Sequence, residues 1–238
     1  MSSIPERLQA VRDAIVAATN EARRPLDAVQ LLAVSKTFGP DAVLAAAAAG
    51  QRAFGENYVQ EGVDKIAAVS VALPGERLVW HFIGPVQSNK TRPIAEHFDW
   101  VHTVEREKIA VRLSDQRPAG LGPLNVCVQV NISGEASKSG VAPAEVAELA
   151  EAVARLPNLR LRGLMAIPEP SDDFTEQRAA FAAMRVLYEQ LRERFGAGFD
   201  TLSMGMSADM RAAILEGATI VRVGSAIFGA RTYNKEQA

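Results

Sequence analysis

Residues 31–40 read LLAVSKTFGP, an apolar, strand-forming run that ends in Lys36 directly before a turn. A lysine next to such a run is costly to bury unless its charge is paired, its amine is neutral or the amine is used covalently. On this stretch alone, the ordinary explanation is a lysine whose stem lies along the strand end while its ammonium stays in water. The functional explanation is an amine that forms a Schiff base with an aldehyde.

Two loops near the C-terminus have residue types that could hold an anion. SMGMS, at residues 203–207, and VGS, at residues 223–225, place glycines and hydroxyls directly before expected helices. The N–H groups at a helix start point outward and bind anions. Alternatively, Gly205 and Gly224 only form turns, and the serines only cap helices. Because both loops share this pattern, we expect a phosphate group to bind here.

The elements that must position these residues alternate regularly between strand and helix. From residue 31 on, eight strand-forming runs are each followed by a helical or turn segment, and the runs lie at residues 31–36, 52–57, 77–84, 98–104, 124–133, 159–167, 199–204 and 219–225. Eight even units predict an α/β fold, a closed (β/α)8 TIM barrel. A doubly wound sheet is the alternative, but no GxGxxG turn follows the first strand. We expect residues 1–238 to form a single domain, with an extra N-terminal helix in residues 1–25 and a tail at residues 232–238.

In such barrels the active site lies at the carboxyl ends of the strands. Polar residues gather at the expected strand ends, namely Lys36, Asn57, Asn131, Ser203, Arg222 and Ser225. A lysine and a phosphate site at one rim predict a ligand that is both a phosphate ester and an aldehyde. Pyridoxal phosphate held by Lys36 fits this description, and so does a sugar phosphate in a Schiff-base aldolase.

Composition excludes several classes of protein. A net charge of −2 over 238 residues provides no basic excess for a nucleic acid. No apolar run approaches the roughly 20 residues of a membrane span. The single Cys127 cannot form an internal disulfide and suits a reducing compartment, so we expect a cytoplasmic protein. The three histidines show no metal-ligand spacing with carboxylates or cysteines, and no metal is expected.

Seven segments in order resemble the pyridoxal phosphate homeostasis protein family: AVSKT, FGENYVQEG, WHFIGPVQSNK, NISGEASKSGV, LRGLMAIP, LSMGMSADM and VRVGSAIFGAR. The resemblance runs from about residue 30 to residue 231. It implies the fold of the alanine racemase N-terminal domain, the barrel known as fold type III among pyridoxal phosphate proteins. It also implies pyridoxal 5'-phosphate as the cofactor.

The resemblance also implies residue roles. Lys36 would hold the cofactor as a Schiff base, Asn57 would lie beside its ring, and Arg222 would face the pyridine nitrogen. The phosphate would be bound by Ser203, Gly224 and Ser225, with the backbone around Gly205 and Met206. Lys138 resembles a lysine implicated in a secondary cofactor interaction, although a solvated loop cation explains it equally well. Because a guanidinium is donor-only, Arg222 would leave the ring nitrogen unprotonated and disfavour transamination.

The expected function is intracellular vitamin B6 homeostasis by a non-catalytic carrier, with no catalytic residue assigned. The alternative is a free-standing amino-acid racemase, which needs a second base opposite Lys36. Alanine racemase-like enzymes take that base, a tyrosine, from an added domain, which this chain is expected to lack, and neither Tyr58, Tyr188 nor Tyr233 is an obvious substitute. Schiff-base aldolases of this fold often carry their lysine on the sixth strand. The aldolase alternative is disfavoured because the sixth strand of this sequence has no lysine. We expect a monomer that makes transient contacts with apo-enzymes that use the cofactor.

Overall fold

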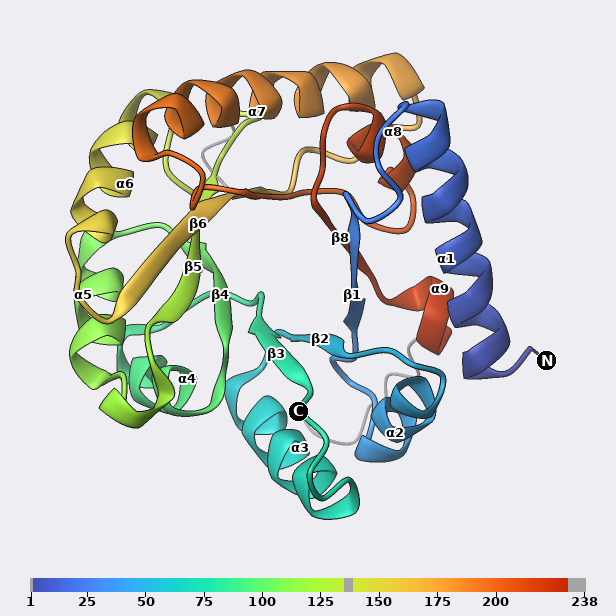
Figure 1. Cartoon of the computed structure of the whole chain (residues 1–238). Coiled ribbons are helices and arrows are strands. Elements are labelled where there is room, and N and C mark those ends of the chain that lie inside the picture. The colour runs from blue at the N-terminus through green and yellow to red at the C-terminus, as the bar shows by residue number, and fades with distance from the viewer. Residues whose placement is uncertain (1, 135–138, 231–238) are drawn as a thin grey trace, which may run out of the picture.

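The computed structural model describes residues 2–134 and 139–230. Eight parallel strands pair in chain order and close into a barrel, which confirms the predicted (β/α)8 fold (Figure 1). The strands are β1 (Gln30–Val34), β2 (Ala53–Glu56), β3 (Val79–Phe82), β4 (Trp100–Val104), β5 (Leu124–Val130), β6 (Leu159–Ala166), β7 (Thr201–Ser203) and β8 (Ile220–Val223). The helices around them are α1 (Ile4–Glu21), α2 (Pro40–Ala48), α3 (Val59–Ala72), α4 (Thr91–His97), α5 (Glu107–Gln116), α6 (Val146–Ala154), α7 (Phe174–Phe195), α8 (Met210–Leu215) and α9 (Ser225–Phe228).

The barrel closes where the first strand meets the last. Leu32 pairs with Arg222 and Ala33 with Val223, so the carboxyl ends of β1 and β8 lie side by side. On the other side of β1, Val34 pairs with Gly55 of β2. Residues that directly follow β1, β2 and β8 therefore meet at one part of the barrel rim.

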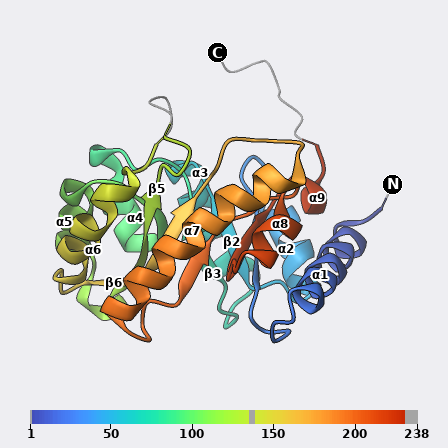
Figure 2. The ribbon, with the colours of Figure 1, turned by 90° about the horizontal axis from the view of Figure 1, so that it is seen from above.

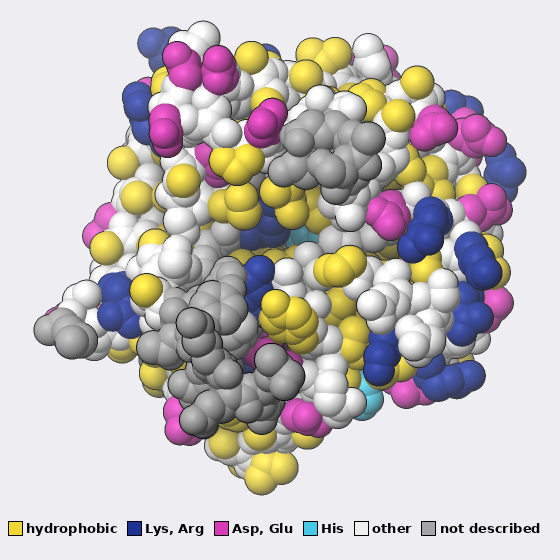
Figure 3. All heavy atoms as spheres, turned by 180° about the vertical axis from the view of Figure 1, so that it is seen from behind, with side chains coloured by type: hydrophobic (Ala, Val, Ile, Leu, Met, Phe, Trp, Pro, Cys, Tyr) yellow, Lys and Arg dark blue, Asp and Glu magenta, His cyan; other side chains and the backbone are white. Residues whose placement is uncertain are grey.

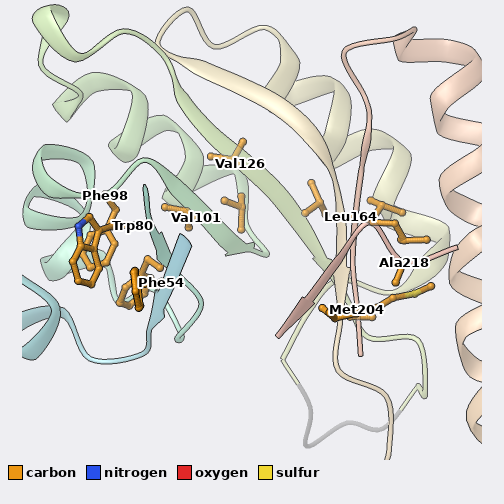
Figure 4. Packing of buried hydrophobic residues seen from close by; sticks show 14 of the residues in the cluster. Phe54, Trp80, Phe98, Val101, Val126, Leu164, Met204 and Ala218 are labelled. Carbon is orange, nitrogen blue, oxygen red and sulfur yellow. The ribbon is translucent and has the colours of Figure 1, made fainter. Parts of the chain in front are cut away.

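The main hydrophobic core lies between the barrel and its helices. Strand side chains alternate in direction, so one set points outward to the helices and the other into the barrel. Figure 4 shows part of the outward set, including Phe54, Trp80, Val101 and Leu164. The rings of Phe54 and Trp80 pack with centroids 5.6 Å apart. Burying each such side chain contributes about 1.5–3 kcal/mol, which makes this shell the main source of stability.

The barrel interior has small apolar clusters in place of one continuous core. Leu32, Ala53 and Ile220 form one, and Trp100, Cys127 and Met165 form another. Cys127 is fully buried, and burial raises the pKa of its thiol to about 12. It is a core thiol that packs with Trp100 and Met165.

Helix α1 precedes the barrel and packs against it. Its N-cap is Ser3, whose Oγ accepts from the backbone N–H of Glu6, while the Glu6 carboxylate accepts from the Ser3 N–H. Its apolar stripe, which includes Leu8 and Ile15, is buried. Figure 2 shows α1 at the side of the barrel near α8 and α9, and Arg7 donates to the carbonyl of Ile227, at 2.6 Å, in α9. The predicted extra N-terminal helix is thus present, whereas the predicted tail at residues 232–238 lies outside the described residues.

Candidate functional site

The carboxyl ends of the strands open on the face shown in Figure 3. A hollow lies near the centre of this face, with Lys or Arg side chains at its base (Figure 3). The predicted rim residues that the structure describes all belong to the ends of strands or to the loops that follow them. Lys138, the predicted secondary cofactor residue, lies outside the described residues.

Lys36 lies two residues beyond the end of β1. The prediction that it ends the first strand is wrong by this margin, because β1 stops at Val34 and a turn follows. The turn is closed by the N–H of Phe38, which donates to the carbonyl of Ser35 at 3.1 Å. Thr37 has a φ of +69°, in the left-handed region that β-branched residues avoid, and an extended strand cannot continue through it. Lys36 itself is half-buried at the rim.

A buried ionic cluster lies beside this turn. Lys65 of α3 is only 3% exposed, and its Nζ donates to Glu56 Oε1 at 2.6 Å, to Glu61 Oε1 at 2.9 Å and to the carbonyl of Ser35 at 2.8 Å. The hydroxyl of Ser35 donates to the same Glu56 oxygen at 2.6 Å. Burial raises the pKa of Glu56, and Lys65 opposes that rise. Because an ammonium has three donors, the cluster satisfies Lys65 completely.

Arg222 is the charged group of β8. It is 4% exposed, and its two terminal nitrogens donate to Ser203 Oγ at 2.9 Å and to the carbonyl of Ala166 at 3.0 Å. Burial lowers its pKa to about 10, so the guanidinium keeps its charge at neutral pH. Arg222 therefore provides a fixed positive charge, and its guanidinium donates hydrogen bonds but cannot accept them.

Ser203 was predicted to bind a phosphate, but its hydroxyl is fully buried. Its Oγ lies 2.8 Å from His102 Nδ1 and accepts from Arg222. His102 Nε2 in turn lies 2.8 Å from His81 Nδ1. The side chain of Ser203 is thus part of a buried chain of four residues and is not exposed at the rim.

His81 and His102, the two histidines of this hydrogen-bonded row, are both neutral. Burial lowers the pKa of His81 to about 3, and it lowers the pKa of His102 well below its ordinary value, with His81 and Arg222 adding to the effect. His81 also stacks on Trp100, with ring centroids 5.2 Å apart. His81 thus lies in the barrel interior, fully buried.

The loop after β7 offers a different serine to the rim. Gly205 has a φ of +92°, and a β-carbon there would lie 2.5 Å from Ala213 Cβ, so this position requires glycine. The backbone N–H of Met206 donates to Asp209 within the loop. Ser207 is exposed, two residues after the turn. Its hydroxyl is therefore open to solvent, unlike that of Ser203.

Gly224 and Ser225 follow β8. A β-carbon on Gly224 would lie 3.2 Å from the carbonyl oxygen of Val34, so glycine lets this loop approach the end of β1 closely. Ser225 is exposed and begins the short helix α9. These residues lie next to the Lys36 turn because β1 pairs with β8.

Asn57 directly follows β2 and lines a cavity of about 290 Å3 at the rim, with Ile83, Pro85, Thr103, Gln129, Ser139 and Ile167. Among the described residues, none donates a hydrogen bond to its buried Oδ1 atom. Gly84 makes the position possible, since a β-carbon there would lie 2.1 Å from the backbone oxygen of Asn57. Asn57 thus brings a buried acceptor without a partner to the edge of this cavity.

Sequence reasoning missed the partners of these residues. The Glu61–Lys65 spacing of i,i+4 is typical of an exposed helix pair, and nothing in the sequence shows that Lys65 is buried. His102 alternates with Trp100 along β4, which was a signal for an inward position. In the part of the chain that the structure describes, no group of three or more His, Cys, Asp or Glu could hold a metal ion. No described helix is long and apolar enough to cross a membrane.

Residues 7–232 match the family model for the alanine racemase N-terminal domain. The chain is 61% identical to a pyridoxal phosphate homeostasis protein of Pseudomonas aeruginosa, covering 98% of both chains, and 57% identical to that of Vibrio cholerae, covering 99% of both. PipY of Synechococcus elongatus, solved with pyridoxal phosphate (PLP) bound, is 36% identical and superposes with a TM-score of 0.80 over 95% of this chain and all of PipY.

Proposed function

Since this chain belongs to the alanine racemase N-terminal domain family and, within it, to the pyridoxal phosphate homeostasis proteins, we propose that it binds pyridoxal 5'-phosphate through Lys36 and serves vitamin B6 homeostasis. One observation carries the residue assignment. The pairing of β1 with β8 brings the Lys36 turn next to Arg222, Gly224 and Ser225 at the carboxyl ends of the strands. An amine, a fixed cation and an exposed hydroxyl thereby face one ligand site.

The residues fit this cofactor in three ways. The unpartnered Oδ1 of Asn57 can accept a hydrogen bond from a ring substituent. The positive charge of Arg222 complements the lone pair of a pyridine nitrogen. The loops after β7 and β8 leave the hydroxyls of Ser207 and Ser225 exposed, and these two can bind the phosphate together with backbone N–H groups near Gly224.

The binding step needs only the lysine and the aldehyde. The ε-amine of Lys36 adds to the aldehyde carbon, and water leaves as the C=N bond forms. Bound in this way, the cofactor would supply an electron sink, and Arg222, which cannot surrender its proton, would keep that sink weak. We therefore propose that Ser203 acts through Arg222, as the acceptor that fixes its guanidinium.

A carrier role is supported by the two tyrosines that the structure describes, neither of which is an evident second base. Among the described residues, Tyr188 donates its hydroxyl to the carbonyl of Phe199, at 3.1 Å, far along α7 from the rim. Tyr58 follows Asn57 and is 56% exposed, so solvent competes for its hydroxyl. We propose a non-catalytic protein of the cytoplasm that acts as a monomer and passes the cofactor to apo-enzymes by transient contacts.

The test is an absorption spectrum of the purified protein with added PLP, followed by borohydride reduction and peptide mass analysis. We expect a visible band and a reduced adduct on Lys36. Lys36→Arg, which keeps the charge, should show neither. A wild-type protein that gains no band and no adduct would contradict the proposal.

A second assay separates the carrier from the racemase. The protein, loaded with PLP, is incubated with single-enantiomer amino acids in heavy water. Deuterium uptake at the α-carbon with inversion at enzymatic rates, abolished by Tyr58→Phe, would overturn the carrier role. Retention of the starting enantiomer is the expected result.

A further inference from the structure

The buried cluster of Lys65, Glu56 and Glu61 holds the backbone on both sides of Lys36. The peptide bond that precedes Lys36 has its carbonyl, that of Ser35, bound by Lys65 Nζ at 2.8 Å. The peptide bond that follows Lys36 has its N–H, that of Thr37, bound by Glu61 Oε1 at 2.6 Å. Two members of one cluster thus fix the two peptide planes that flank a single α-carbon.

The second hydrogen bond holds a strained residue. Thr37 has a φ of +69°, a backbone conformation that is strained for a β-branched residue. A residue stays in such a conformation only where its surroundings determine it. The Glu61 carboxylate is one such constraint, because it accepts the Thr37 N–H in this conformation.

The cluster is also anchored to the barrel through Glu56. Glu56 is fully buried at the end of β2, and it binds both Lys65 and the Ser35 hydroxyl. Removing either charge would leave the other buried without its partner, which is strongly destabilising. The cluster is therefore a rigid link between β2, α3 and the turn that carries Lys36.

We propose that Glu61 and Lys65 are positioning residues, which set the direction in which the Lys36 amine leaves the backbone and so prepare it for the aldehyde. This inference rests on the proposed function. It explains why α3 carries a carboxylate that reaches a turn 24 residues earlier in the chain. Orientation of a reacting group before the encounter accelerates bond formation because less conformational freedom is lost in the reaction.

The decisive variant is Glu61→Ala, because Glu61 is partly exposed and its loss leaves the Lys65–Glu56 pair intact. Asp64→Ala is the matched control: it removes the same charge from the same helix at an exposed position, and the only hydrogen bond of Asp64 comes from Gln60 among the described contacts. Glu61→Gln is the rescue variant, since its amide oxygen can still accept from Thr37. Lys65→Met is unsuitable, because it leaves Glu56 buried without its cation.

Two readouts are compared after equal melting temperatures have been verified. The first is the rate at which the visible band grows when PLP is mixed with apoprotein. We expect Glu61→Ala to slow it on the order of tenfold, Glu61→Gln to stay within about twofold of wild type, and Asp64→Ala to match wild type. The second is hydrogen exchange at the Thr37 amide without cofactor, which should accelerate in Glu61→Ala alone.

Equal rates in Glu61→Ala and Asp64→Ala would overturn the inference while the wild-type band upholds the proposed function. Equal slowing in Glu61→Ala and Glu61→Gln would also overturn it, since charge and not the bond to Thr37 would then matter. A wild-type protein without any band would instead refute the proposed function, and the exchange experiment would still decide whether Glu61 holds the turn.

Discussion

The Nδ1 atom of His81 lies 2.8 Å from the Nε2 atom of His102, and both rings are fully buried inside the barrel. The same chain continues from His102 to Ser203 and from Ser203 to Arg222. Because Arg222 can only donate, all three hydrogen bonds can be made if each group donates to the next. The guanidinium then donates to the Ser203 hydroxyl, the hydroxyl to His102, and His102 to His81. In that arrangement both histidines are neutral and carry their proton on Nε2.

Stability should fall as the pH drops below about 6.5. His81 has a pKa of about 3 in the folded state, so the unfolded chain binds more protons at any pH between 3 and 6.5. His81 alone should then reduce the free energy of unfolding by about 2 kcal/mol between pH 7 and pH 5. Urea unfolding at the two pH values measures this.

His81→Gln should show a smaller pH dependence, and His97→Gln, at an exposed position of α4, should retain that of wild type. Identical pH dependence in the two variants would mean that His81 does not titrate as its burial requires.

Ser203, the last residue of β7, and Ser207, in the loop that follows, should respond differently to removal of the hydroxyl. Ser203→Ala leaves a buried Arg222 nitrogen and His102 Nδ1 without this partner, and should lower the free energy of unfolding by about 1–3 kcal/mol. Ser207→Ala, at an exposed position, should change stability by less than about 0.5 kcal/mol and instead weaken PLP binding.

Denaturant unfolding and titration of the visible band give the two quantities. Ser207→Ala with unchanged affinity for PLP would show that its hydroxyl does not bind the phosphate.

Gly84→Ala should damage both the fold and the ligand site. The new β-carbon would lie 2.1 Å from the backbone oxygen of Asn57, so the backbone must move. We expect a loss of about 1–3 kcal/mol and weaker PLP binding, because Asn57 is displaced. The melting temperature should fall by roughly 2–4 °C for each kcal/mol in a chain of this size.

Gly120→Ala is the control, since a β-carbon there meets no atom within 4 Å. If the two variants have the same melting temperature, the close approach of Gly84 to Asn57 does not contribute to stability.

Cys127 should resist thiol reagents in the folded protein. Its thiol is fully buried, and burial raises its pKa to about 12, so almost no thiolate is available at neutral pH. Modification by a disulfide reagent should proceed at the rate of unfolding and become fast in urea. A Ser70→Cys variant, exposed on α3, provides the second, reactive thiol for comparison. Rapid reaction of native wild-type protein would contradict the burial.

The barrel could be predicted from the sequence because each unit carries local signals. Apolar strands, helix caps such as Ser3 and closing glycines each depend on a few neighbouring residues. The residues at the strand ends could be predicted for the same reason, since a parallel barrel brings all carboxyl ends to one face.

The side-chain partners could not be predicted, because they come from distant parts of the chain. Ser203 is bound by His102, 101 residues earlier, and this contact turns its hydroxyl inward. The strand β1 ends earlier than predicted for a similar reason. Thr37, in the left-handed conformation, is held by Glu61, which lies far from the strand in the sequence.

Pairing of β1 with β8 also determines when during synthesis the site can exist. Lys36 is synthesised long before Arg222 and Gly224, and neither half of the proposed site has its neighbour until β8 has been made. A nascent or truncated chain that ends before residue 220 therefore has Lys36 without the strand beside it. If Lys36 captures the aldehyde as proposed, capture is coupled to synthesis of the last strand of the barrel.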